Sequence, residues 1–126
     1  MSLNVLVVDD SRVMRRMILR TLGIAGLPIE EALEAGSAEQ GWELLERGDV
    51  GLALLDINLP GMSGIELLEK MRGSASWQDT PVVVISTEGS EPRRRAVERH
   101  RAGFVRKPFT PEALARAVVD AVGAAP

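Results

Sequence analysis

The fold is decided by one short stretch, VLVVDD at residues 5–10. Its four apolar residues do not alternate with polar ones, which predicts a strand buried on both faces, as in a parallel sheet covered by helices. Two further runs have the same character, LALL at residues 52–55 and VVVI at residues 82–85. Weaker strands are predicted near residues 29–33 and 103–106.

Helical patterns fill the gaps between these strands, and each begins near a residue that can cap a helix. The five capping residues are Ser11, Ser37, Ser63, Ser90 and Thr110. Ser37 and Ser63 are each followed three residues later by Gln or Glu, which is the pattern of a capping box. Repeated strand-helix order of this kind predicts an α/β fold, a doubly wound five-stranded parallel sheet flanked by five helices with right-handed crossovers.

Length and composition limit the possible functions. A chain of 126 residues with 45% apolar and 26% charged residues is expected to form one domain, residues 1–126, with its core at about 4–122. The net charge of −3 argues against nucleic-acid binding, and the absence of Cys excludes disulfides and thiolate metal sites. No signal peptide or membrane-length apolar run is evident, so we expect a cytoplasmic protein without a membrane partner.

Polar residues follow the apolar runs where the strands end. Asp9 and Asp10 follow the first predicted strand, and Asp56 follows the third. Ser86 follows the fourth, and Lys107 follows the fifth. Because ligands of such sheets bind at the carboxyl ends of the strands, we expect these side chains to meet in one crevice.

The predicted crevice has a definite chemistry. Three carboxylates repel one another unless a cation lies between them, and oxygen ligands without Cys favour Mg²⁺ over Zn²⁺. Mg²⁺ usually keeps positions open for phosphate oxygens, so one carboxylate could act as a nucleophile toward phosphorus. Lys107 could neutralise the phosphoryl oxygens and Ser86 could donate a hydrogen bond to one of them.

Each residue also has a plainer interpretation. Asp9 and Asp10 could cap the following helix, and Asp56 could belong to the turn before Pro60 and Gly61. Lys107 could be an ordinary surface lysine. Thr87 is an alternative to Ser86 as the hydroxyl ligand, and the five residues together favour the site over these readings.

Four motifs together resemble the receiver domains of response regulators in two-component signalling. They are LVVDDS at residues 6–11, LLDINLPGMSG at 54–64, VIS at 84–86 and KPF at 107–109. Their order and spacing are those of the family, and the resemblance covers residues 4–122. It is greatest to the single-domain, CheY-like regulators of chemotaxis, and it implies the flavodoxin-like strand order 2-1-3-4-5.

The resemblance assigns roles to the residues of the crevice. Asp56 would be the phosphoacceptor and itself a ligand of Mg²⁺, which Asp10 would bind directly and Asp9 largely through water. The backbone carbonyl of Asn58 would be a further ligand. The phosphoryl group would be bound by Ser86 and Lys107, and the bond between Lys107 and Pro108 would be cis.

The resemblance also implies a switch. The phosphoryl group would draw in Ser86, and Phe104 would turn into the space left behind. The surface of the fourth helix, fifth strand and fifth helix would then change for a protein reader. Phe104 could instead be simple core packing. The nearby arginines could be a solvated face or could attract an acidic partner; they are Arg93, Arg94, Arg95, Arg99, Arg101 and Arg106.

Two positions bear on how long a phosphoryl group would last. Asn58 lies two residues after Asp56, and Glu88 lies two residues after Ser86. In receivers these positions flank the path of the attacking water, and polar side chains there can orient it. The pair is similar to that of fast-decaying chemotaxis regulators, so we expect a short-lived acyl phosphate.

The favoured function is a stand-alone switch, phosphorylated by a histidine kinase and read by another protein. It would catalyse only its own phosphorylation and dephosphorylation, and it would be a monomer unless phosphorylation makes it dimerise. The alternative is a phosphorelay shuttle that passes the phosphoryl group to a histidine phosphotransfer protein. A hydrolase is disfavoured because Asn58 stands where such enzymes need an acid-base Asp. A nucleotide-binding domain is disfavoured because no glycine-rich phosphate loop follows the first predicted strand.

Overall fold

The computed structural model describes residues 3–87 and 89–123, and ten elements alternate along them. The strands are β1 (Leu3–Val8), β2 (Ile29–Ala35), β3 (Leu52–Leu55), β4 (Val82–Ser86) and β5 (Gly103–Arg106). The helices are α1 (Arg12–Ile24), α2 (Ala38–Arg47), α3 (Gly64–Arg72), α4 (Glu91–Arg99) and α5 (Pro111–Gly123). The expected repeat of strand and helix is therefore confirmed.

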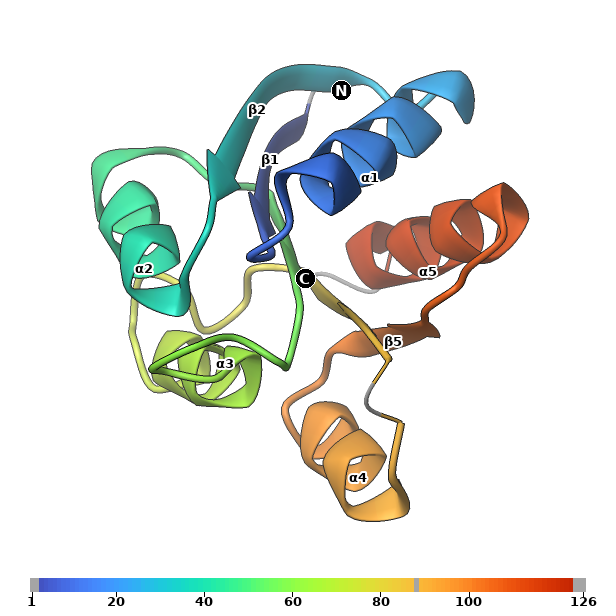
Figure 1. The fold of residues 1–126 in the computed structure, drawn as a ribbon. Helices are drawn as coiled ribbons and strands as arrows, with labels where there is room; N and C mark the ends of the chain where they lie inside the picture. The colour runs from blue at the N-terminus through green and yellow to red at the C-terminus, as the bar shows by residue number, and fades with distance from the viewer. Residues whose placement is uncertain (1–2, 88, 124–126) are drawn as a thin grey trace.

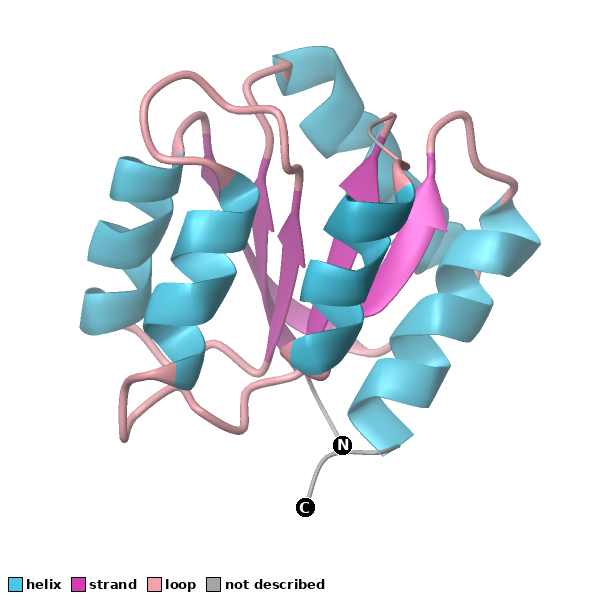
Figure 2. Ribbon diagram, turned by 90° about the horizontal axis from the view of Figure 1, so that it is seen from below, coloured by secondary structure: helices cyan, strands magenta, loops and turns pink. Residues whose placement is uncertain are grey.

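The five strands form one parallel sheet in the order β2-β1-β3-β4-β5, as the resemblance implied. Helices cover both faces (Figures 1 and 2). On one face α1 and α5 pack on β1, β3 and β4, and on the other face α2, α3 and α4 do so. The three central strands are almost entirely buried, which explains why their sequences do not alternate.

The weaker strands lie at the two edges of the sheet. β2 runs to Ala35, two residues beyond its predicted end at residue 33, because its pairing with β1 continues to the Val8–Ala35 pair. Glu30 and Glu31 are exposed and interrupt the apolar pattern, so periodicity alone underestimated the length of β2. β5 has the predicted bounds.

The helices begin where their caps predicted. Ser63 forms the complete capping box with Glu66. At α2 the box is incomplete: the Ser37 hydroxyl accepts a hydrogen bond from the Gln40 backbone N–H, but the Gln40 side chain accepts from Gly36 instead of Ser37. Within residues 3–87 and 89–123, no helix combines the length and apolar character that a membrane crossing requires.

Candidate functional site

Buried polar side chains gather at one edge of the sheet. Among residues 3–87 and 89–123, the polar or charged residues classed as buried are Asp9, Asp56 and Ser86. They stand at or just beyond the carboxyl ends of β1, β3 and β4, which are neighbouring strands. Burial of polar groups is costly unless partners satisfy them, so this cluster is where a function is expected.

Lys107 joins two of these carboxylates. Its Nζ lies 2.7 Å from Asp9 Oδ2 and 3.1 Å from Asp56 Oδ2, and its side chain is only 12% exposed. The surface-lysine interpretation is therefore wrong. Burial alone would lower the pKa of Lys107, but hydrogen bonds from its ammonium group to Asp9 and Asp56, together with their charges, outweigh burial and raise it. Lys107 thus remains a cation at physiological pH.

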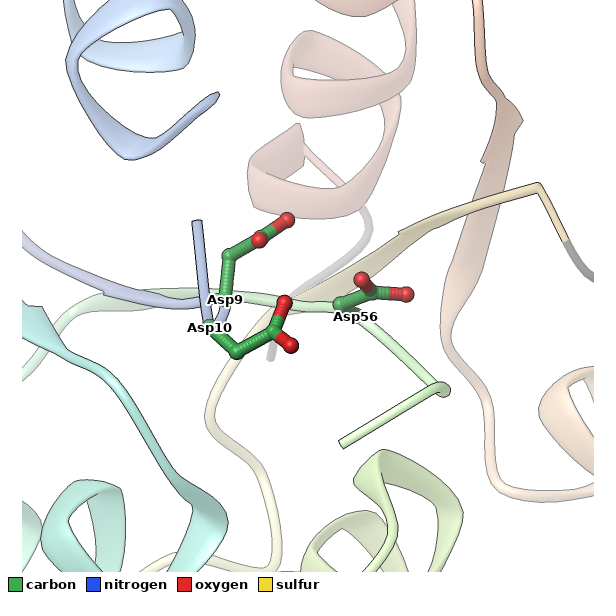
Figure 3. A group of neighbouring side chains, drawn as sticks. All are labelled: Asp9, Asp10 and Asp56. Carbon is green, nitrogen blue, oxygen red and sulfur yellow. The ribbon is translucent and has the colours of Figure 1, made fainter. Parts of the chain in front are cut away.

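The three aspartates lie close enough to share one cation. Asp9, Asp10 and Asp56 each offer a carboxylate oxygen, and these oxygens lie within 4.8 Å of one another. Figure 3 shows Asp9 and Asp10 beside each other after β1, with Asp56 at the end of the neighbouring strand β3. Asp10 is exposed, so the cluster opens to solvent on its side. A compact set of oxygen donors that opens to solvent fits Mg²⁺, which binds few carboxylates and retains several waters.

Hydrogen bonds in the turn after β1 fix the position of Asp9, which precedes Asp10. The Ser11 backbone N–H donates to Asp9 Oδ1 at 2.8 Å, and the Asp9 N–H donates to the Ala35 carbonyl at 3.1 Å. Ser11, not Asp9 or Asp10, is the N-cap of α1, and its hydroxyl accepts from Met14. The interpretation of the paired aspartates as helix caps is therefore wrong.

The loop after β3 holds Asp56 through backbone contacts. The Asn58 N–H donates to Asp56 Oδ1 at 3.2 Å, and Asn58 itself is exposed. Gly64 lies against the Asp56 carbonyl so closely that a Cβ there would stand 1.9 Å from its oxygen. Only glycine fits this approach. The roles of Asn58 as a carbonyl ligand and as a guide for water stay predictions.

Ser86 lies one strand away from Lys107. It is the last residue of β4, and its carbonyl accepts from the Lys107 N–H at 3.0 Å. Thr87 is exposed, so burial favours Ser86 as the hydroxyl of the site. The Lys107–Pro108 bond is cis, as the resemblance implied. Glu88, the second predicted decay residue, lies outside the described residues.

Phe104 lies beside the site on β5. It is half-buried, packs against the core on the α2-α3-α4 face, and pairs with Val84 of β4. The guanidinium carbon of Arg94 stands 5.2 Å from the centre of its ring, a cation-π distance. The predicted arginines are all exposed on or near α4 and β5; they are Arg93, Arg94, Arg95, Arg99, Arg101 and Arg106.

Sequence reasoning missed three residues around the site. Gly64 ended the motif at residues 54–64, but its contact with the Asp56 carbonyl was not predicted, because it depends on the path of the loop. Arg15 and Glu34 form an ion pair beside Asp9, with Arg15 Nε 3.0 Å from Glu34 Oε1. They are separated by 19 residues in sequence, so no local pattern indicates the contact.

Comparisons with known proteins point to one family. The family model described as response regulator receiver domain matches residues 5–119. A chemotaxis protein CheY homologue of Campylobacter jejuni is 36% identical over 96% of this chain and 93% of its own length. Chemotaxis protein CheY1 of Helicobacter pylori is 36% identical over 89% of this chain and 90% of its own. The crystallised chemotaxis protein CheY4 of Vibrio cholerae superposes with a TM-score of 0.84 at 28% identity, covering 96% of this chain and 99% of its own.

Proposed function

This chain belongs to the CheY-like receiver domains of response regulators in two-component signalling, and we propose that it is a switch phosphorylated on Asp56. The observation that supports this most strongly is the bridge from Lys107 to both Asp9 and Asp56 inside a three-acid cluster. The bridge places a fixed cation against the carboxylate that would carry the phosphoryl group. The proposed phosphodonor is the phosphohistidine of a histidine kinase.

The proposed transfer is a substitution at phosphorus. An Asp56 carboxylate oxygen forms the new P–O bond while the P–N bond to the donor imidazole breaks, and the imidazole nitrogen keeps the electron pair and takes a proton from solvent. Lys107 Nζ neutralises charge on the phosphoryl oxygens, and the Ser86 hydroxyl donates a hydrogen bond to one of them. Mg²⁺, when held by Asp9, Asp10, Asp56 and the Asn58 carbonyl, would neutralise further negative charge there.

We assign the end of the signal to hydrolysis by the chain itself. This assignment is supported by Asn58, which is exposed and whose backbone N–H donates to Asp56 Oδ1. We propose that its polar side chain orients the water that attacks the acyl phosphate. Water forms a new bond to phosphorus while the bond between phosphorus and the Asp56 oxygen breaks, so inorganic phosphate leaves, the proton of the water goes to solvent and the carboxylate is restored. This favours a short-lived signal, and therefore a switch, over a shuttle that must preserve its phosphoryl group for transfer to a histidine.

The proposed output surface comprises α4, β5 and α5. Phosphorylation draws Ser86 toward the phosphoryl group, and Phe104, which pairs with Val84 beside it, moves in response. Arg94 contacts the ring of Phe104, so a change at Phe104 reaches the exposed arginines of α4 directly. Charges of this density suit a reader whose docking segment is acidic.

The test is phosphorylation by acetyl phosphate, a small-molecule donor, followed by intact-mass measurement. Wild type is expected to gain one phosphoryl group with Mg²⁺ and to gain very little when the metal is chelated. Asp56→Asn is expected to gain none. Asp49→Asn is the matched control, because Asp49 is an exposed aspartate away from the cluster. Labelling of Asp56→Asn at the wild-type rate would refute the proposal.

The reader needs a separate experiment. The isolated reader should bind phosphorylated wild type faster in low salt than in high salt, and Arg94→Glu should lose that acceleration. Arg47→Glu in the last turn of α2, an exposed position outside α4, β5 and α5, is a control for net charge alone. Equal association rates for wild type and Arg94→Glu would show that the arginines serve only solubility.

A further inference from the structure

The carbonyl of Asp9 is held by a side chain from α1. Arg15 Nη1 donates to the Asp9 backbone oxygen at 2.6 Å, while Nε of the same guanidinium donates to Glu34 Oε1 at 3.0 Å. The two side chains are only 15% and 24% exposed. A planar guanidinium that is fixed at one edge by a carboxylate presents its other edge in a defined direction. Arg15 is therefore a rigid brace between β2 and the turn after β1.

This brace completes a set of contacts around Asp9. The backbone N–H of Asp9 donates to the Ala35 carbonyl, Asp9 Oδ1 accepts from the Ser11 N–H, and Asp9 Oδ2 accepts from Lys107 Nζ. The remaining polar group of Asp9 is the carbonyl that Arg15 binds. That carbonyl shares one planar peptide unit with the N–H of Asp10. By fixing the plane, Arg15 fixes the direction in which Asp10 leaves the strand.

Asp10 needs such help more than its neighbours do. Asp9 and Asp56 are buried and bound by Lys107, whereas Asp10 is exposed. Its carboxylate is nevertheless part of the three-acid cluster in which all ligand oxygens lie within 4.8 Å (Figure 3). The position of an exposed side chain depends strongly on the backbone that carries it.

Glu34 also controls the charge of the brace. It pairs with Arg15 through Oε1 and with Arg16 through Oε2 at 2.9 Å. A cation beside a metal site repels the metal ion. An unrestrained arginine side chain could also bind the carboxylates of the acidic cluster and compete with the metal ion for them. Glu34 offsets part of that charge and keeps Arg15 on the backbone carbonyl.

We propose that Arg15, oriented by Glu34, is a positioning residue that sets the Asp9–Asp10 peptide so that Asp10 can bind a divalent cation. This inference rests on the proposed function, because it assumes that the acidic cluster takes up Mg²⁺. It assigns Arg15 no contact with the reacting groups. Its effect is transmitted through the backbone, as for other residues that orient metal ligands.

The test compares two neighbouring arginines by calorimetric titration with Mg²⁺, without any phosphodonor. Arg15→Met and Arg16→Met each remove one positive charge and one partner of Glu34, but Arg15 contacts the Asp9 carbonyl and Arg16 is 62% exposed. Loss of charge alone would tighten Mg²⁺ binding in both. We expect Arg15→Met to bind Mg²⁺ roughly tenfold more weakly, and Arg16→Met to bind at least as tightly as wild type.

A second measurement reports on the peptide itself in metal-free protein. The amide ¹⁵N and ¹H shifts of Asp10 should move in Arg15→Met and stay in place in Arg16→Met, while core amides such as that of Leu54 stay in place in both. Should Arg15→Met fail to fold, as urea unfolding would reveal, Arg15→Lys and Glu34→Gln take its place. Lysine cannot bind both partners, and glutamine cannot hold two arginines as strongly, so both should weaken Mg²⁺ binding to a smaller degree.

The outcomes separate this inference from the proposed function. Mg²⁺ affinity in Arg15→Met equal to or above that of wild type, with an unmoved Asp10 amide, would overturn the positioning role while leaving the metal site intact. Absence of Mg²⁺ binding in wild type would overturn the metal site itself, and with it this role.

Discussion

Helices α3 and α4 have the same length but are held very differently. Each has nine residues. α3 buries Gly64, Leu67, Leu68 and Met71, whereas α4 buries only Val97. α3 begins with a reciprocal capping box, whereas the N-cap of α4, Ser90, makes no side-chain cap bond.

Under the proposed function, this difference corresponds to the two tasks of a phosphorylation switch. α3 follows the loop that holds Asp56, where a reacting group needs a fixed position. α4 follows Ser86 and carries the arginines, where a response needs a segment that moves at low cost in free energy. Rigidity and mobility are therefore separated between adjacent strand-helix units of one sheet.

The most severe test of the rigid side is Gly64→Ala. The added Cβ would overlap the Asp56 carbonyl, so we expect a loss of about 3 kcal/mol in the free energy of unfolding, with slower phosphorylation. Urea unfolding measures the first and acetyl phosphate labelling the second. Gly23→Ala in α1 is the matched control, since nothing lies within 4 Å of its added carbon. A stable, fully active Gly64→Ala would contradict the rigid loop.

Lys107 binds both Asp9 and Asp56, and its contribution to the free energy of unfolding should depend on pH. Lys107→Met leaves two buried carboxylates without their cation and should cost roughly 3 kcal/mol near neutral pH. The pKa of Lys107 is raised in the folded protein above its ordinary value of 10.5. The stabilisation is therefore complete below that value and is lost as the pH rises through the higher folded value. Urea unfolding of both proteins at a series of pH values would check this, and a difference that faded between about pH 7 and 9 would contradict it.

Hydrogen exchange compares the two helices directly. α3 buries two more large apolar side chains than α4, which corresponds to about 3 kcal/mol or roughly a hundredfold in protection. Backbone amides in the middle of α3 should therefore exchange far more slowly than those of α4. Equal protection would remove the distinction on which the comparison depends.

The smallest expected effects concern the caps. Ser63→Ala removes a reciprocal cap and should cost about 1 kcal/mol. Ser90→Ala removes a side chain that makes no cap bond, so its cost should be at most a few tenths of a kcal/mol. Thermal unfolding resolves the two. A larger loss for Ser90→Ala would show that α4 is capped after all.

Much of the fold could be predicted from the sequence, because elements that are buried on both faces consist of consecutive apolar residues. Uninterrupted apolar runs predicted the central strands, and the capping box that begins at Ser63 predicted the start of α3. β2 was underestimated because an edge strand keeps polar residues, and its last pairing, Val8 with Ala35, depends on its neighbour.

The site was predictable to the extent that its residues follow strands. Asp9, Asp56 and Lys107 could be placed at one sheet edge because parallel topology brings strand ends together. The contact of Gly64 with Asp56 could not be predicted, since it depends on loop geometry. The brace of Arg15 and Glu34 could not be predicted either, because an ion pair between a helix and a strand 19 residues apart has no periodic signal.

The bridge between Asp9 and Lys107 spans 98 residues of sequence. Asp9 follows β1 and Lys107 follows β5, so the contact can form only after β5 has joined the sheet that contains β1. A nascent chain on the ribosome, or a fragment lacking its last strand, holds the aspartates but not their ammonium partner. Under the proposed function, Lys107 can therefore assist phosphorylation of Asp56 only after β5 has joined the sheet.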